Sequence, residues 1–204
     1  MTVALGELAI DEHCTRTDRA TLTMVVAWFG ATTMVAAYLL GAHTAGLPTP
    51  TRDDAALHAE LVRNDHGRPM VFHVLSADCE CSARVLARLA LRGPRADVDE
   101  HVVVVGTGAD LATLEREGFD VEEASAEEIA RRFDVQVAPL LVVATTPDDV
   151  AYVGGYTARK RGERVATDDL IDAVLRGENP EALPVLGCAT TSRMRDATDP
   201  WRLR

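Results

Sequence analysis

The chain has few of the features that mark disulfide-rich, nucleic-acid-binding or zinc-stabilised proteins. Its 204 residues include four cysteines, which is too few for a disulfide framework. No second cysteine pair or histidine pair completes the ligand set of a structural zinc site. The net charge is −11 and lysine occurs once, so we predict no nucleic-acid partner. Repeats and low-complexity tracts are absent too, which leaves a globular domain of ordinary size with a short appendage.

One uncharged run stands near the N-terminus, from Ala20 to Ala42, between Arg19 and His43. About 20 apolar residues are enough for a helix to cross a bilayer. We therefore predict a transmembrane anchor at 20–42. The run exceeds the apolar core of about 7–15 residues found in cleaved signal peptides, which favours an uncleaved anchor over that alternative.

The charges that flank this run predict its orientation. Arg16 and Arg19 precede it, whereas the first arginine after it is Arg52, followed by two aspartates. The positive-inside rule then places segment 1–19 in the cytoplasm and the main domain in an extracytoplasmic, periplasmic location. We expect a single-pass protein with membrane lipid as one partner, and a compartment in which disulfides persist.

Helical and strand patterns alternate along the remaining chain, after a linker at 43–52. We predict helices at 53–64, 81–91, 109–117, 125–133 and 167–176, and strands at 69–75, 100–106, 119–124, 140–144 and 150–154. Alternating elements followed by a late hairpin indicate an α/β domain, a mixed sheet with helices on both faces. This domain would occupy 53–178, with 179–204 as a C-terminal tail.

Two cysteines separated by one residue, Cys79 and Cys81, lie where the first strand gives way to a helix. Unpaired N–H groups and the helix dipole at that position favour a thiolate. Asp78 and Glu80 place negative charge beside the thiols, which should raise their pKa. We expect Cys79 to be the more exposed thiol and therefore the nucleophile.

Three local features resemble the thioredoxin fold over about residues 53–177. They are the cysteine pair at the strand-to-helix corner, the segment 133–139 that is similar to the family's proline loop, and the hairpin that ends at Gly154 and Gly155 before a closing helix. The resemblance implies that Pro139 is cis and packs against the cysteines. It also implies a buried proton acceptor at the position of His73, where a histidine would serve the resolving thiol.

More narrowly, the apolar anchor, His73, the Cys-x-Cys-Ser motif and Gly187-Cys188-Ala189 resemble membrane-anchored bacterial proteins of the RedB type. The family's usual motif has two residues between the cysteines, whereas this chain has only Glu80. A disulfide that closes so short a ring strains the backbone and should be easily reduced. This departure favours isomerase or mild reductase chemistry over strong oxidation.

The leading hypothesis is therefore a membrane-anchored extracytoplasmic thiol–disulfide oxidoreductase that acts on protein thiols without a cofactor. Cys79 would attack, Cys81 or Cys188 would resolve the mixed disulfide, Pro139 would shape the docking groove and His73 would handle the proton. Gly187 permits a tight turn, so the tail could return Cys188 to either thiol of the pair.

Two alternatives stay open. Cys79, Cys81, Cys188 and His73 could hold Cu(I) in a chaperone or assembly factor, since soft thiolates select that ion. The protein could also be a redox-inactive accessory subunit of a larger membrane complex.

Overall fold

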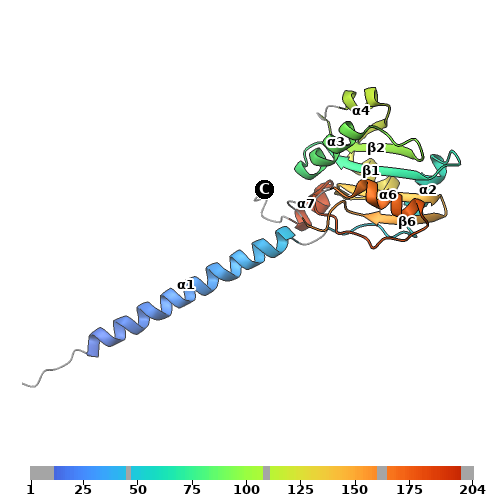
Figure 1. Cartoon of the computed structure of the whole chain (residues 1–204). Coiled ribbons are helices and arrows are strands. Elements are labelled where there is room, and N and C mark those ends of the chain that lie inside the picture. The colour runs from blue at the N-terminus through green and yellow to red at the C-terminus, as the bar shows by residue number, and fades with distance from the viewer. Residues whose placement is uncertain (1–11, 45–46, 108–110, 160–164, 199–204) are drawn as a thin grey trace, which may run out of the picture. The chain divides into compact units, whose positions relative to one another are not determined.

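The structure is a computed structural model that describes residues 12–44, 47–107, 111–159 and 165–198. It consists of two units, residues 1–44 and 45–204. The described part of the first unit is the helix α1 (Glu12–Thr44; Figure 1), in which the stretch Arg19–Leu40 is long and apolar enough to cross a membrane. Within it Thr23 and Thr32 donate hydroxyl hydrogen bonds to the carbonyls of Arg19 and Trp28, 2.8 and 2.9 Å away. Hydroxyls paired in this way need no water, which suits either an anchor or a signal sequence.

The second unit is built on a five-stranded mixed sheet in the order β3-β2-β1-β5-β6. Its strands are β1 (Met70–Ser76), β2 (Asp99–Val105), β3 (Asp120–Ala124), β5 (Leu140–Thr146) and β6 (Asp149–Gly154). β1, β2 and β3 are parallel, whereas β5 is antiparallel to both β1 and β6. The helices are α2 (Ala55–Arg63), α3 (Glu80–Arg92), α4 (Ala112–Glu117), α5 (Ala126–Phe133) and α6 (Thr167–Leu175). This arrangement confirms the predicted α/β class and is thioredoxin-like.

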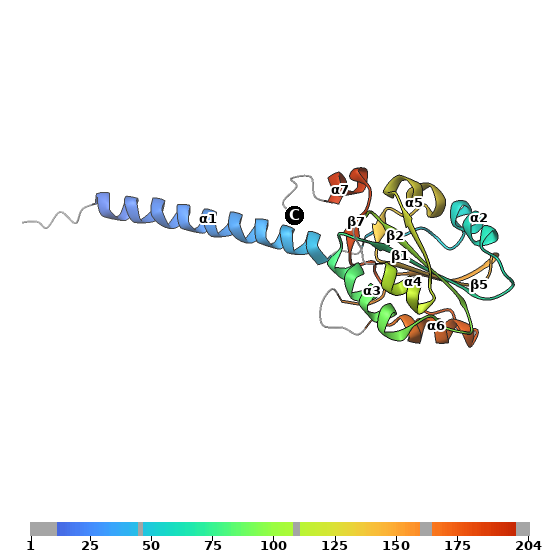
Figure 2. The same ribbon diagram turned by 90° about the horizontal axis from the view of Figure 1, so that it is seen from above.

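Helices cover both faces of the sheet because its central strands are apolar on both sides. Met70, Phe72 and Val74 of β1 join a core with α2 and α5. The alternate residues Val71 and Leu75 join a second core with α3, α4 and α6. Figure 2 shows α2 and α5 on one side of the sheet and α3 and α6 on the other. His73 has the same strand parity as Val71, so it lies on the α3 and α6 face.

The predicted C-terminal tail is more ordered than the sequence suggested. It contains β7 (Cys188–Ala189), which pairs with β4 (Val137–Ala138), and a short helix, α7 (Ser192–Thr198). We call residues 183–191 the C-terminal strap. The amide of Gly155 donates to Leu183 at 2.8 Å, that of Leu47 to Val185 at 2.9 Å and that of Thr190 to Gln136 at 2.8 Å. The strap is therefore fixed to the domain along its whole length.

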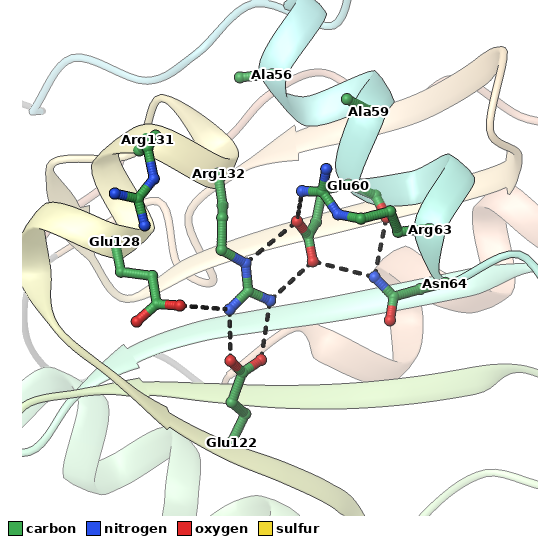
Figure 3. A pocket seen from close by; sticks show the side chains of 9 residues that line it. All are labelled: Ala56, Ala59, Glu60, Arg63, Asn64, Glu122, Glu128, Arg131 and Arg132. Atoms are coloured by element: carbon green, nitrogen blue, oxygen red, sulfur yellow. Dashed lines mark hydrogen bonds and ion pairs between the residues drawn. The ribbon is translucent and has the colours of Figure 1, made fainter.

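A polar pocket between α2 and α5 is lined by an ion-pair network (Figure 3). The Glu60 side chain is only 2% exposed and pairs with Arg132 at 2.8 Å and with Arg63. Arg132 also pairs with Glu122 of β3. Burial raises the pKa of Glu60, but the two guanidinium groups outweigh this effect and leave it below 4.5. The opposite charges of the network compensate each other. Its ion pairs join α5 to α2 and to β3.

Arg132→Met should lower the free energy of unfolding by about 3 kcal/mol at neutral pH, since Glu60 loses a buried partner. Ion pairing that depresses a carboxyl pKa stabilises the fold above the unfolded-state pKa, and this contribution disappears as pH falls through the folded-state pKa. The difference from the wild type, measured by denaturant unfolding, should therefore shrink below about pH 4.5. Arg131→Met, on the exposed side of α5, is the matched control. A difference that is constant from pH 7 to pH 3 would contradict this account.

Candidate thiol site

The cysteine pair lies at a tightly bonded corner between β1 and α3. Cys79 is the extended N-cap residue of α3, and its amide donates to the carbonyl of Ser76 at 3.2 Å. The amide of Ser76 in turn donates to the buried hydroxyl of Ser82 at 3.0 Å. The amide of Ala77 donates to Val105 of the neighbouring strand at 2.9 Å. These hydrogen bonds fix the backbone of the corner and therefore the direction in which each cysteine side chain points.

The expected exposure of the two thiols is wrong. Cys79 is 1% exposed, whereas Cys81 is only half-buried. The Cys79 sulfur lies 3.7 Å from the carbonyl oxygen of Ala138, under the strand that the strap pairs with. Cys81 lies two residues further on, within α3, and lines a small surface pocket. Cys79 therefore cannot be the first thiol to meet a large substrate.

The strap places the third thiol beside this pair. Cys188 is directly opposite Ala138 in the antiparallel β4–β7 ladder. The side chains of Cys188 and Cys81 both hydrogen-bond to Cys79, and all three cysteines are present as thiols. The structure thus brings together three thiols, two of which are more than 100 residues from the third in sequence.

The pKa of Cys79 is lowered, contrary to the expectation from its acidic neighbours. The hydrogen bond from Cys188 is the largest cause and the one from Cys81 the next, and together they outweigh burial, which acts in the opposite direction. Asp78 and Glu80 are exposed, whereas Cys79 is buried, so solvent screens their charges. The site therefore favours a buried Cys79 thiolate that accepts two thiol hydrogen bonds.

Pro139 borders both the buried thiol and the pocket. The Ala138–Pro139 peptide bond is cis, and Pro139 is buried. The pocket beside Cys81 is lined further by Arg84, Val85, Pro139, Tyr156, Thr157, Val165 and Leu186. Because Cys81 and Pro139 both line this mostly apolar pocket, a molecule bound in it would approach both residues.

His73 is fully buried, and neighbours hold both of its ring nitrogens. Nε2 lies 3.1 Å from Oε1 of Glu100, and Nδ1 lies 2.9 Å from the hydroxyl of Tyr156. Burial lowers the pKa of His73, and the attraction of Glu100 only partly offsets this effect. With both nitrogens engaged, His73 has no free ligand atom for the copper site of the alternative hypothesis. Across the ranges that the structure describes, no group of three or more His, Cys, Asp or Glu residues is arranged to hold a metal ion.

Sequence reasoning missed the partners of His73. Arg92 Nη1 binds Glu100 Oε2 at 3.0 Å, and the amide of Arg95 donates to the same oxygen at 2.8 Å. Burial raises the pKa of Glu100, but the effects of His73 and Arg92 are larger and lower this pKa to about 2. The alternation of side chains along a strand could have predicted the place of Glu100. Glu100 and Val102 are two residues apart in β2, so both point to the face of the sheet on which His73 lies. No local pattern marks Tyr156.

The comparison with known protein families found no match, and neither did the sequence comparison with curated proteins. Among solved structures, the chain is similar to an uncharacterised conserved protein from Geobacillus kaustophilus, with 17% identity over 61% of this chain and 77% of that one, at a TM-score of 0.46. A thioredoxin candidate from Neisseria meningitidis has 13% identity over 67% and 95% of the two chains, at 0.41. The reduced N-terminal domain of PilB from N. meningitidis has 15% identity over 54% and 83%, at 0.35.

Gly187→Ala should separate the strap from the proline loop. A Cβ at residue 187 would lie 1.8 Å from the Ala138 carbonyl oxygen and 2.5 Å from Pro139 Cδ, both too close to be accommodated without movement. We expect Cys79 to become open to alkylation at least about tenfold faster, because its cover moves away. Peptide mapping after timed alkylation measures this rate, with the exposed Ser192→Ala as control. Unchanged protection of Cys79 would show that the strap is not its cover.

Cys188→Ala should raise the pKa of Cys79 toward that of an ordinary thiol, because the largest hydrogen bond to its thiolate is lost. Thiolate absorbance near 240 nm, followed during acid titration of the reduced protein, reports this change. The wild type should lose one thiolate only in strong acid, and the variant at higher pH. Identical titrations would contradict the role assigned to Cys188.

Proposed function

We propose that this protein is a membrane-tethered, extracytoplasmic thiol–disulfide oxidoreductase. The observation that supports it is the convergence of Cys81 and Cys188 on a Cys79 of lowered pKa, beside Pro139. A buried thiolate beside a half-buried thiol supplies the resolving and the attacking group that disulfide exchange needs. Protein thiols and disulfides are the proposed clients, and no cofactor is needed for this reaction.

The burial of the thiols divides their roles. Cys81 loses its proton to solvent at the pocket and attacks a client disulfide as a thiolate. A bond forms between Cys81 and one client sulfur, and the other client sulfur leaves as a thiolate that takes up a proton from solvent. The Cys79 thiolate then attacks Cys81, which forms a Cys79–Cys81 disulfide and releases the first client sulfur as a thiolate. Two electrons reduce the client and the cysteine pair is oxidised; the reverse sequence oxidises a dithiol.

Anchoring through α1 is part of the proposal. Its span Arg19–Leu40 has the length and composition of a membrane helix. Arg16 and Arg19 support a cytoplasmic N-terminus and a domain on the outer side. A tethered oxidoreductase would act on clients near the membrane surface, including subunits of a larger membrane complex.

The experiment that tests this function is exchange between the full chain in detergent micelles and a peptide disulfide, with trapping of mixed disulfides. Cys81→Ser should abolish exchange, since Cys81 is the thiol that lines the pocket where a client disulfide would bind. Cys79→Ser should accumulate a mixed disulfide at Cys81, because the resolving thiol is gone. Cys14→Ser, which changes the fourth cysteine, is the control and should exchange at the wild-type rate.

Three outcomes would overturn the proposal. Trapping at Cys188 in place of Cys81 would contradict the assigned roles. Equimolar Cu(I) bound by the reduced protein, without exchange, would favour a carrier. A bridge that mild reductants do not open would favour an accessory subunit.

A further inference from the structure

The hydroxyl of Tyr156 has one hydrogen to donate, and two atoms that can accept a hydrogen bond lie close to it. It is 2.9 Å from Nδ1 of His73 and 3.2 Å from the carbonyl oxygen of Leu140. Tyr156 is almost completely buried, so water does not compete for this hydrogen. Burial also raises its pKa well above the usual value of 10.0, which keeps the hydroxyl protonated. The position of this hydrogen must therefore depend on the state of His73.

The charge on Glu100 determines the tautomer of neutral His73. The ionised carboxylate of Glu100 accepts hydrogen bonds and donates none, so Nε2 of His73 must carry a proton. In the neutral ring Nδ1 is then an acceptor, and it takes the Tyr156 hydroxyl hydrogen. Protonation of His73 converts Nδ1 into a donor. The Tyr156 oxygen must then accept from it, and the hydroxyl hydrogen turns to Leu140.

This rearrangement reaches the thiol site by two routes. One runs along the chain from Leu140 to Pro139 and Ala138, and the other through the pocket that Tyr156 and Cys81 both line. Leu140 directly follows Pro139, whose ring borders the pocket beside Cys81. Tyr156 itself lines the same pocket. A change in the hydrogen bond at Leu140 thus acts on the loop that also covers Cys79 through Ala138.

We infer that Tyr156 is a positioning residue that couples protonation of buried His73 to the state of the thiols. The inference rests on the proposed function and deepens it, because it adds proton-linked regulation to the same site. Coupling between two equilibria is reciprocal: if His73 protonation affects the thiols, oxidation or alkylation of the thiols must change the titration of His73.

Several charged groups set the midpoint of this titration. Glu100 of β2 favours the imidazolium, whereas Arg92 of α3 opposes it. Asp168 of α6 also favours it and pairs with Arg92 at 3.0 Å. Burial dominates, so His73 should titrate below 6.5 and be neutral at pH 7.

The test compares the full-length protein with reduced thiols and with alkylated thiols. The imidazole resonances of His73, identified by their absence in His73→Gln, give its titration midpoint in each state. We expect the two midpoints to differ by about 0.7 pH units, which is a fivefold coupling. The exchange rate should also show a step in its pH profile at the His73 midpoint.

Tyr156→Phe removes only the hydroxyl and should abolish both effects, so that His73 titrates identically in the two thiol states. Tyr152→Phe is the matched control: its buried hydroxyl donates to Gly155 at 2.6 Å and accepts from the amide of Leu183 at 3.2 Å, whereas the hydroxyl beside His73 is that of Tyr156. That variant should keep both effects. If Tyr156→Phe does not fold, His73→Gln replaces it, since a glutamine cannot take up the proton and should remove the step in rate.

Identical His73 midpoints in the two wild-type states, or a difference that persists in Tyr156→Phe, would overturn the inference. A step in rate that survives in His73→Gln would overturn it as well. Failure of the proposed function looks different: wild-type protein would exchange no disulfide, while its His73 midpoint still responds to alkylation of Cys81.

Discussion

The contact between Gly187 and the Ala138–Pro139 loop is the constraint on which the thiol site depends. No side chain fits there, because a Cβ would meet backbone and proline atoms directly. The missing side chain allows β7 to pair with β4, and this pairing puts Cys188 opposite Ala138. One close backbone approach thereby supplies the third thiol, covers Cys79 and forms one wall of the pocket through Leu186.

As a consequence, the cysteine with the lowered pKa is not the cysteine that solvent can reach. A reactive cysteine usually combines a lowered pKa with exposure to solvent. Here Cys79 has the lowered pKa but is buried, whereas Cys81 is accessible and lies beside it. The thiolate is thus held away from solvent, while the neighbouring thiol lines the pocket.

Most of the fold follows from local sequence patterns, and most of the site does not. Alternating apolar residues in β1 and β2 predict a sheet covered on both faces, because side-chain direction is a property of neighbouring residues. The burial of Cys79 depends on the strap, which starts more than 100 residues later. Long-range pairing of a two-residue strand such as β7 leaves no periodic signal. Gly187 was a sign of the close approach: it predicted a turn that could return Cys188 to the cysteine pair, but it did not predict the pairing of β7 with β4.

The hydrogen-bonded side chains around His73 show a second limit of prediction from the sequence. His73 is recognisable from its place in an apolar strand, but its chemistry depends on what surrounds both ring nitrogens. Glu100 is bound by His73, Arg92 and the amide of Arg95, so its buried charge is compensated on every side. A carboxylate satisfied in this way stays ionised and fixes the histidine tautomer, which in turn orients the Tyr156 hydroxyl. The orientation of the Tyr156 hydroxyl therefore depends on the hydrogen-bonded chain that begins at Arg92 and Glu100, and inspection of His73 or Tyr156 alone does not predict it.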